Sequence, residues 1–213
     1  MEEMQLEQVL PREIEKRSFE IITEELKGRT FPAEQEAIIK RCIHTSADFD
    51  YADNLVFSEG AVEIAKEAFR NGACIVTDTQ MAKAGINKRS LAKFGGEAFC
   101  FIADEDVAEK AKEQEITRSA VSMEKAATLD KELIFAIGNA PTALVKLYEL
   151  IKEGKIKPKL IIGVPVGFVN VVQAKELIMT ADVPYIVARG RKGGSNIAAA
   201  ICNALLYQMD KER

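Results

Sequence analysis

The chain has 213 residues, of which 47% are hydrophobic and 29% charged. These proportions are typical of a globular protein with enough apolar material for a core, and they exclude disordered and fibrous classes. The 33 acidic residues outnumber the 29 basic ones, and the net charge of −4 argues against a nucleic-acid partner, which usually requires a basic excess. The length predicts one α/β domain over 1–213, with an N-terminal helical segment (1–71) before a parallel-sheet core (72–213).

We expect no targeting or membrane segment. The amino terminus is polar and acidic, without a basic start before an apolar run, so no secretory signal is predicted. The longest stretch without Asp, Glu, Lys or Arg, 193–209, contains glycines, amides and a hydroxyl, which favours a buried helix over a membrane span. Four scattered cysteines, no CxxC and one histidine argue against a zinc site. The predicted location is the cytoplasm.

Three helical segments are predicted before the first strand, at about 12–27, 33–44 and 58–71. Pro11 suits the first turn of the first helix, and Gly28 suits its end. A doubly wound sheet does not require these N-terminal helices. The helices could cover a sheet edge, close over a ligand cleft or form a dimer surface.

Five continuous apolar runs are predicted to be strands, at 73–77, 98–103, 133–137, 160–164 and 185–188. They do not alternate polar with apolar residues, a pattern typical of parallel strands covered on both faces. Segments of helical period separate them, at 79–94, 104–129, 141–153 and 168–180. The alternation predicts a three-layer α/β/α sandwich around a five-stranded, mostly parallel sheet with right-handed crossovers.

Turns rich in glycine, proline, asparagine and hydroxyls follow four of these strands. In open parallel sheets, ligands bind beyond the carboxyl ends of the strands. The predicted strand ends lead into TDTQ at 77–80, GNAPT at 138–142, GVPVGFVN at 163–170 and RGRKGGSN at 189–196. In the first of these turns, Asp78 could orient a base, accept a hydrogen bond from a ligand amide, or cap the next helix.

The turn at 189–196 indicates an anion site. Three cations and three glycines precede a charge-free helix, whose amino terminus presents N–H groups and a partial positive charge. Arg189 and Arg191 could add bidentate contacts to a carboxylate or phosphate. A flexible, solvated basic loop is the alternative. Neither a GxxxxGK[ST] nor a GxGxxG motif is present, so nucleotide binding is disfavoured.

His44 is the only histidine and therefore the first candidate for proton transfer near neutral pH. It lies near the predicted end of a helix, where the macrodipole favours an imidazolium. Arg41 lies three residues earlier on about the same face, so both side chains could meet one ligand. Alternatively, His44 caps its helix and Arg41 is solvated. Asp48 and Asp50 could be an acid pair or metal ligands, although turn and capping roles are favoured.

A hydroxyl interrupts the apolar stripe of the first predicted helix. Ile14, Ser18 and Ile22 are spaced by four residues, so Ser18 shares their face. A buried or cleft-facing hydroxyl needs a hydrogen-bond partner. Close packing of helices around a small residue explains the position equally well.

At these residues the sequence resembles the precorrin-8X methylmutase family of cobalamin biosynthesis, which includes cobalt-precorrin-8 methylmutases. The resemblance rests on HTSADFD at 44–50, TDT at 77–79, GNAPTAL at 138–144, GVPVGFVN at 163–170 and GRKGGS at 190–195. It implies a flavodoxin-like fold, a homodimer and an isomerase without a cofactor, any cobalt belonging to the substrate. The reaction would move a methyl group from C-11 to C-12 of the contracted tetrapyrrole, giving hydrogenobyrinate or cobyrinate.

The resemblance also implies a set of site residues. The family's catalytic histidine falls on His44, which we expect to donate a proton to the conjugated ring, and its substrate contacts fall on Ser18 and Arg41. Basic side chains would bind the carboxylates around the ring, while Pro165, Val166 and Phe168 would line its face. The predicted substrate-binding residues are Ser18, Arg41, Thr45, Asp78, Asn139, Pro165, Phe168, Asn170, Arg189, Arg191, Lys192, Gly193 and Ser195; no metal ligand is predicted.

Two other functions are compatible with the same residues. One is a non-catalytic corrinoid carrier that holds the pigment in the same cleft. The other is an α/β enzyme that acts on a phosphorylated small molecule at the turn 189–195.

Overall fold

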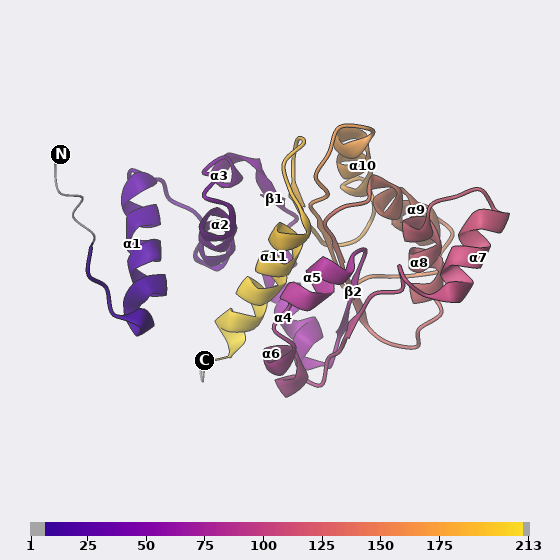
Figure 1. Ribbon diagram of the computed structural model, residues 1–213, viewed down its shortest axis with the longest axis horizontal. Coiled ribbons are helices and arrows are strands. Elements are labelled where there is room, and N and C mark those ends of the chain that lie inside the picture. Colours follow the sequence, from indigo (N-terminus) through magenta and orange to yellow (C-terminus); the bar gives the residue numbers. More distant parts are fainter. Residues whose placement is uncertain (1–6, 211–213) are drawn as a thin grey trace.

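The sheet has six strands, in the order β1-β6-β5-β4-β2-β3, in a computed structural model that describes residues 7–210 (Figure 1). Strands β2 to β6 are parallel and correspond to the five predicted runs. Their order is the 2-1-3-4-5 arrangement of flavodoxin-like folds, which confirms the predicted class. The strands are β1 (Leu55–Phe57), β2 (Cys74–Thr77), β3 (Ala98–Phe99), β4 (Leu133–Ile137), β5 (Leu160–Gly163) and β6 (Tyr185–Ala188).

The prediction of five strands is wrong because of β1, which lies inside the segment expected to be helical. It pairs antiparallel with β6, with Leu55 opposite Ala188, and so extends the sheet at one edge. Its three residues directly follow a single helical turn, and so short a run has no period that distinguishes it from its surroundings. At the opposite edge, β3 keeps only two of the six residues predicted for it.

Capping residues divide two of the predicted helices. Asn87 caps α6 by accepting from the N–H of Ser90, and Thr117 caps α8 by accepting from the N–H of Ala120. The segments 79–94 and 104–129 therefore each form two helices. The helices are η1 (Pro11–Glu13), α1 (Ile14–Glu25), α2 (Ala33–Ser46), α3 (Tyr51–Asn54), α4 (Ala61–Arg70), α5 (Gln80–Gly85), α6 (Lys88–Lys93), α7 (Glu105–Glu113), α8 (Arg118–Ala126), α9 (Pro141–Lys152), α10 (Val171–Ile178) and α11 (Ser195–Met209).

Helices cover both faces of the sheet, as the continuous apolar strands require. Along β4, Ile134 and Ala136 pack into the core shared with α4 and α11, whereas Phe135 and Ile137 pack into the core shared with α8, α9 and α10. Both sets are fully buried. The three-layer sandwich predicted from the sequence is therefore confirmed.

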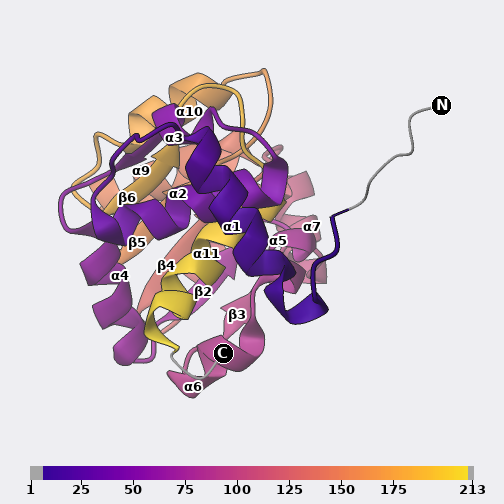
Figure 2. The ribbon, with the colours of Figure 1, turned by 90° about the vertical axis from the view of Figure 1, so that its left-hand side faces the viewer.

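Two further helical layers lie outside α11. Helix α2 packs along α11, and α1 packs on α2 as the outermost element (Figure 1). Viewed from that side, α1 lies in front of α2 and α11 (Figure 2). Because α11 is enclosed between the sheet and α2, it has little solvent-facing surface, which explains why it carries no charged residue. The N-terminal helices α1 and α2 thus cover one face of the core.

Asp78 spans the point where the strand order reverses, between β2 and β4. Its carboxylate accepts hydrogen bonds from the backbone N–H groups of Gly138 (2.9 Å), Asn139 (2.8 Å) and Ala140 (2.6 Å). Burial raises the pKa of Asp78, and these three hydrogen bonds oppose that shift. The predicted capping role is wrong, because Thr79 caps α5 instead. Asp78 therefore connects the ends of β2 and β4 by hydrogen bonds.

Replacing Asp78 by Ala is expected to lower the free energy of unfolding by about 3 kcal/mol or more, because three buried N–H groups would lose a charged acceptor. Urea unfolding followed by circular dichroism measures the change. The control is Asp106→Ala, since the exposed Asp106 carboxylate pairs with Lys125 and should contribute little to stability because water screens the pair. An equal loss of unfolding free energy in the two variants would contradict the role of Asp78 in connecting the two strands.

Candidate functional site

The predicted site residues form two groups that a set of ion pairs connects. Ser18 lies on α1, and Arg41, His44 and Thr45 lie on α2. The other predicted residues lie in turns after the strands or, for Ser195, at the start of α11. The side chain of Lys192, in the turn after β6, reaches Asp48 (2.7 Å) in the loop that follows α2. The two groups therefore belong to one continuous region.

Phe19 joins the first group. Its ring stacks on the imidazole of His44, with centroids 5.3 Å apart and planes inclined by 11°. The guanidinium of Arg41 lies 4.7 Å from the centre of the same ring. The sequence predicted that Arg41 and His44 share a helical face, and their common contact with Phe19 confirms it. Ser18, the neighbour of Phe19, donates to the carbonyl of Ile14 at 2.9 Å, which gives its hydroxyl a partner within its own helix.

His44 and Thr45 are exposed in the last turn of α2, and the next residues fix where that helix ends. Ala47 adopts a left-handed conformation with φ of 54° and donates to the carbonyl of Ile43, a common way to stop a helix. The hydroxyl of Ser46 donates to the carbonyl of Cys42 at 2.7 Å. These bonds hold the imidazole in the last turn of α2.

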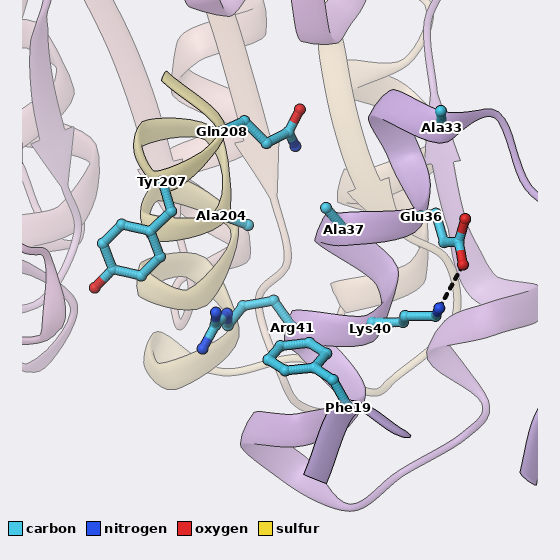
Figure 3. Close-up of a pocket in the computed structure, with 9 residues that line it drawn as sticks. All are labelled: Phe19, Ala33, Glu36, Ala37, Lys40, Arg41, Ala204, Tyr207 and Gln208. Atoms are coloured by element: carbon cyan, nitrogen blue, oxygen red, sulfur yellow. Dashed lines mark ion pairs between the residues drawn. The ribbon is translucent and has the colours of Figure 1, made fainter. Parts of the chain in front are cut away.

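A groove of about 410 Å³ opens beside this group, between α1, α2 and α11 (Figure 3). Arg41 lies between Phe19 and Tyr207, whose ring centre is 5.4 Å from the guanidinium. His44 does not line the groove and adjoins it through Phe19. The volume is at the small end of ligand cavities, roughly 300–1,000 Å³. The lining residues are Phe19, Ala33, Glu36, Ala37, Lys40, Arg41, Ala204, Tyr207 and Gln208.

The turn after β6 packs closely on neighbouring backbone. At Gly193, whose φ is +158°, a Cβ would lie 2.0 Å from the carbonyl oxygen of Val164, so only glycine fits. The N–H of Gly194 donates to that same oxygen at 2.9 Å. Ser195, which starts α11, shares a hydrogen bond of 2.7 Å with the hydroxyl of Thr79. Close packing therefore requires glycine at position 193.

Three of the four predicted substrate-binding cations, Arg41, Arg189 and Lys192, form ion pairs with acidic side chains of the same chain. Arg41 pairs with Glu15 of α1. Arg189 pairs with Glu176 of α10 at 3.2 Å. The guanidinium of the fourth cation, Arg191, lies 5.4 Å from the centre of the Phe168 ring.

Lys192 contacts both acidic residues that follow α2, Asp48 at 2.7 Å and Asp50 at 2.6 Å. This contact lowers the pKa of Asp48, and the two carboxylates raise that of Lys192. Asp48 also accepts from the N–H of Asp50 at 3.0 Å, so the favoured turn role is confirmed. In the range 7–210, no group of three or more His, Cys, Asp or Glu side chains is placed to hold a metal ion.

The other predicted residues differ in exposure. Phe168, 80% exposed, and Asn139 and Asn170 lie at the surface, where a ligand can reach them. Pro165 is buried, and so is Asp78, whose carboxylate is engaged by backbone amides. Pro165 and Asp78 therefore support the turns of the site from inside the protein.

Sequence reasoning missed Phe19 and Lys175. Phe19 follows Ser18 in an amphipathic helix, where an aromatic residue ordinarily indicates core packing. Lys175 of α10 is fully buried, and its ammonium donates to the carbonyls of Gly190 (2.9 Å) and Lys192 (2.8 Å). Burial lowers the pKa of Lys175 to about 8. Lysines in helices usually extend their charge into water, so no sequence pattern distinguishes this one.

None of the helices described between residues 7 and 210 is both long enough and apolar enough to cross a membrane.

Comparisons with known proteins identify the family. The family model described as precorrin-8X methylmutase matches residues 13–208. The chain is 47% identical to the cobalt-precorrin-8 methylmutase of Priestia megaterium, over 95% of this chain and 90% of the relative. It is also 47% identical to that of Salmonella typhimurium, over 93% and 96% of the two chains. The structure of precorrin-8X methylmutase from Thermus thermophilus superposes with a TM-score of 0.84 and 39% identity, covering 92% of this chain and 96% of that one. The chain belongs to the precorrin-8X methylmutase family of isomerases.

Proposed function

We propose that this protein moves a methyl group from C-11 to C-12 of a precorrin-8-type corrinoid, with His44 as proton donor and acceptor. The observation that carries the proposal is the shared contact of His44 and Arg41 with Phe19. It places an exposed imidazole beside a cation at the rim of an open groove. Cobalt-precorrin-8 is the preferred substrate, because both relatives at 47% identity carry that name.

The proposed chemistry needs one proton and no electrons. Protonated His44 donates to the conjugated ring system, which withdraws electron density and eases migration of the methyl group. After migration, the same proton returns to the imidazole and conjugation is restored. Because no electron or group passes between molecules, we propose that the protein supplies no cofactor of its own. Any cobalt is then part of the substrate.

Substrate carboxylates are proposed to replace the protein's own acidic side chains. Arg41, Arg189 and Lys192 already hold carboxylates in the geometry of ion pairs, with Glu15, Glu176 and Asp48 as partners. Partly exposed ion pairs contribute only about 0–1 kcal/mol, so exchange of one carboxylate for another costs little. The exposed ring of Phe168 is available for the apolar face of the corrinoid.

A second copy of the chain is proposed to complete the site. The groove is open and small for a macrocycle, and His44 is exposed beside it. Large apolar side chains are exposed on two separate segments, near the start of α1 and in the turn after β5. Exposed apolar surface of this kind is found at protein interfaces. The exposed side chains are Leu10, Ile14, Val166, Phe168 and Val169.

The cytoplasm remains our prediction for the compartment. The four cysteines are all free thiols within the described residues, as expected for a protein kept in a reducing environment.

His44→Ala is expected to lower kcat by about 100- to 10,000-fold, because the reaction would lose its proton donor. The visible spectrum of cobalt-precorrin-8, followed in parallel with that of precorrin-8, measures turnover of each. Circular dichroism checks that the variant is folded. Near-wild-type turnover by a folded variant would refute the role of His44. Tight binding by the wild type without any spectral change would indicate a carrier instead.

Phe19→Leu is expected to lower kcat/KM by roughly 10-fold, because leucine keeps the apolar contact but loses the stacking on His44 and Arg41. The matched control is Phe31→Leu, which removes a partly buried ring that contacts Arg29. Its kcat/KM should stay close to that of the wild type. Equal activity in the two variants would show that the stacking has no part in catalysis.

Light scattering on the purified protein is expected to give twice the mass of one chain. Ile14→Glu places a charge on an exposed position of α1 and should shift the protein towards the mass of one chain with loss of turnover. The control is Ile116→Glu on the far side of the molecule, next to α7. A fully active wild-type protein with the mass of one chain would refute the shared site.

A further inference from the structure

Lys175 is a fully buried cation that the proposed reaction does not yet use. It lies in α10, beneath the turn after β6, and its ammonium donates to the carbonyls of Gly190 and Lys192. No carboxylate is among its hydrogen-bond partners in the range 7–210. A buried ammonium without a carboxylate is costly, so its retention needs an explanation.

We propose that Lys175 is a positioning residue that holds the turn 189–194 so that its basic side chains face the substrate's carboxylates. This inference rests on the proposed function of the turn. It assigns to Lys175 no contact with the substrate.

The turn depends on such an anchor because its own backbone is permissive. Gly190, Gly193 and Gly194 all have positive φ, and glycine restricts the chain less than any other residue. Hydrogen bonds from elsewhere must therefore select one conformation. Lys175 supplies two of them, and the N–H of Gly167 supplies a third by donating to the carbonyl of Arg191 at 3.1 Å.

These three hydrogen bonds engage three consecutive carbonyl oxygens, so the oxygens are not presented to an approaching carboxylate. The oxygens of residues 190, 191 and 192 all accept bonds from the protein. A carbonyl oxygen carries a partial negative charge and repels an anion. With these oxygens engaged, the ligand meets the side chains of Arg189, Arg191 and Lys192.

The charge on Lys175 adds to the same effect. Burial lowers its pKa to about 8, so the ammonium form predominates at neutral pH. A positive charge behind the turn raises the local potential there, and a buried charge is screened less than a surface one. A neutral donor would supply hydrogen bonds without this attraction.

The anchor also acts on the loop next to His44. The backbone of Lys192 is held by Lys175, and its side chain pairs with Asp48 and Asp50 after α2. A turn released from Lys175 would loosen this connection between the two halves of the site.

Lys175→Met tests the proposal because methionine fills similar space without charge or donors. We expect KM for cobalt-precorrin-8 to rise about 10-fold or more while kcat changes by less than about 3-fold, because carboxylate contacts are made alike in ground and transition states. Hydrogen exchange measured by mass spectrometry should show faster exchange in the segment 189–194. The matched control is Lys146→Met on the far face, where Lys146 pairs with Glu124 and Glu149; it should leave all three values unchanged.

Lys175→Arg and Lys175→Gln keep the test decisive if methionine prevents folding. Arginine retains charge and donors, so its KM should lie closer to that of the wild type than the KM of the glutamine variant, which retains donors alone. An unchanged KM, or unchanged exchange at 189–194, in a folded variant would overturn the role of Lys175. A wild-type protein that converts neither cobalt-precorrin-8 nor precorrin-8 would instead overturn the proposed function.

Discussion

The buried carboxylate of Asp78 holds together the turns at the point where the strand order reverses. Flavodoxin-like folds usually bind at the point where the strand order reverses, with backbone amides directed at the ligand. Here the amides of residues 138–140 are satisfied by Asp78 itself, and the start of α11 packs on Gly138, where a Cβ would lie 2.7 Å from the Cα of Ser195. The amides at this point are therefore engaged within the protein, and the exposed candidate side chains lie in the turns after β4, β5 and β6 and on α2.

The candidate site is assembled from elements that are distant in the sequence and are held by different interactions. Packing fixes α2 against the buried, charge-free α11, and hydrogen bonds at 46–50 fix where α2 ends. Hydrogen bonds to Lys175 fix the basic turn, and the ion pairs of Lys192 connect it to α2. His44 and the basic turn after β6 thus keep their relative positions through packing, hydrogen bonds and ion pairs of other residues.

The sequence predicted the parts of the fold that have a strong period or a continuous apolar run. The strands 133–137 and 185–188 and the buried helix after Gly194 follow directly from such patterns. It failed at β1, which is only three residues long, and at the capped breaks before α6 and α8. Residue type and spacing made Arg41 and His44 candidates, and the family resemblance assigned them a role. Phe19 and Lys175 were not candidates, because aromatic residues and lysines in amphipathic helices ordinarily serve packing and solvation.

Helix α1 is a long helix that buries little of its surface. Ile22 is its one buried residue, and its main packing partner is α2, although it carries Phe19 and Glu15, which cover Arg41. Segments with few buried contacts open locally at a free-energy cost far below that of global unfolding. Opening of α1 alone would therefore uncover Arg41 while the strands of the sheet keep their pairing.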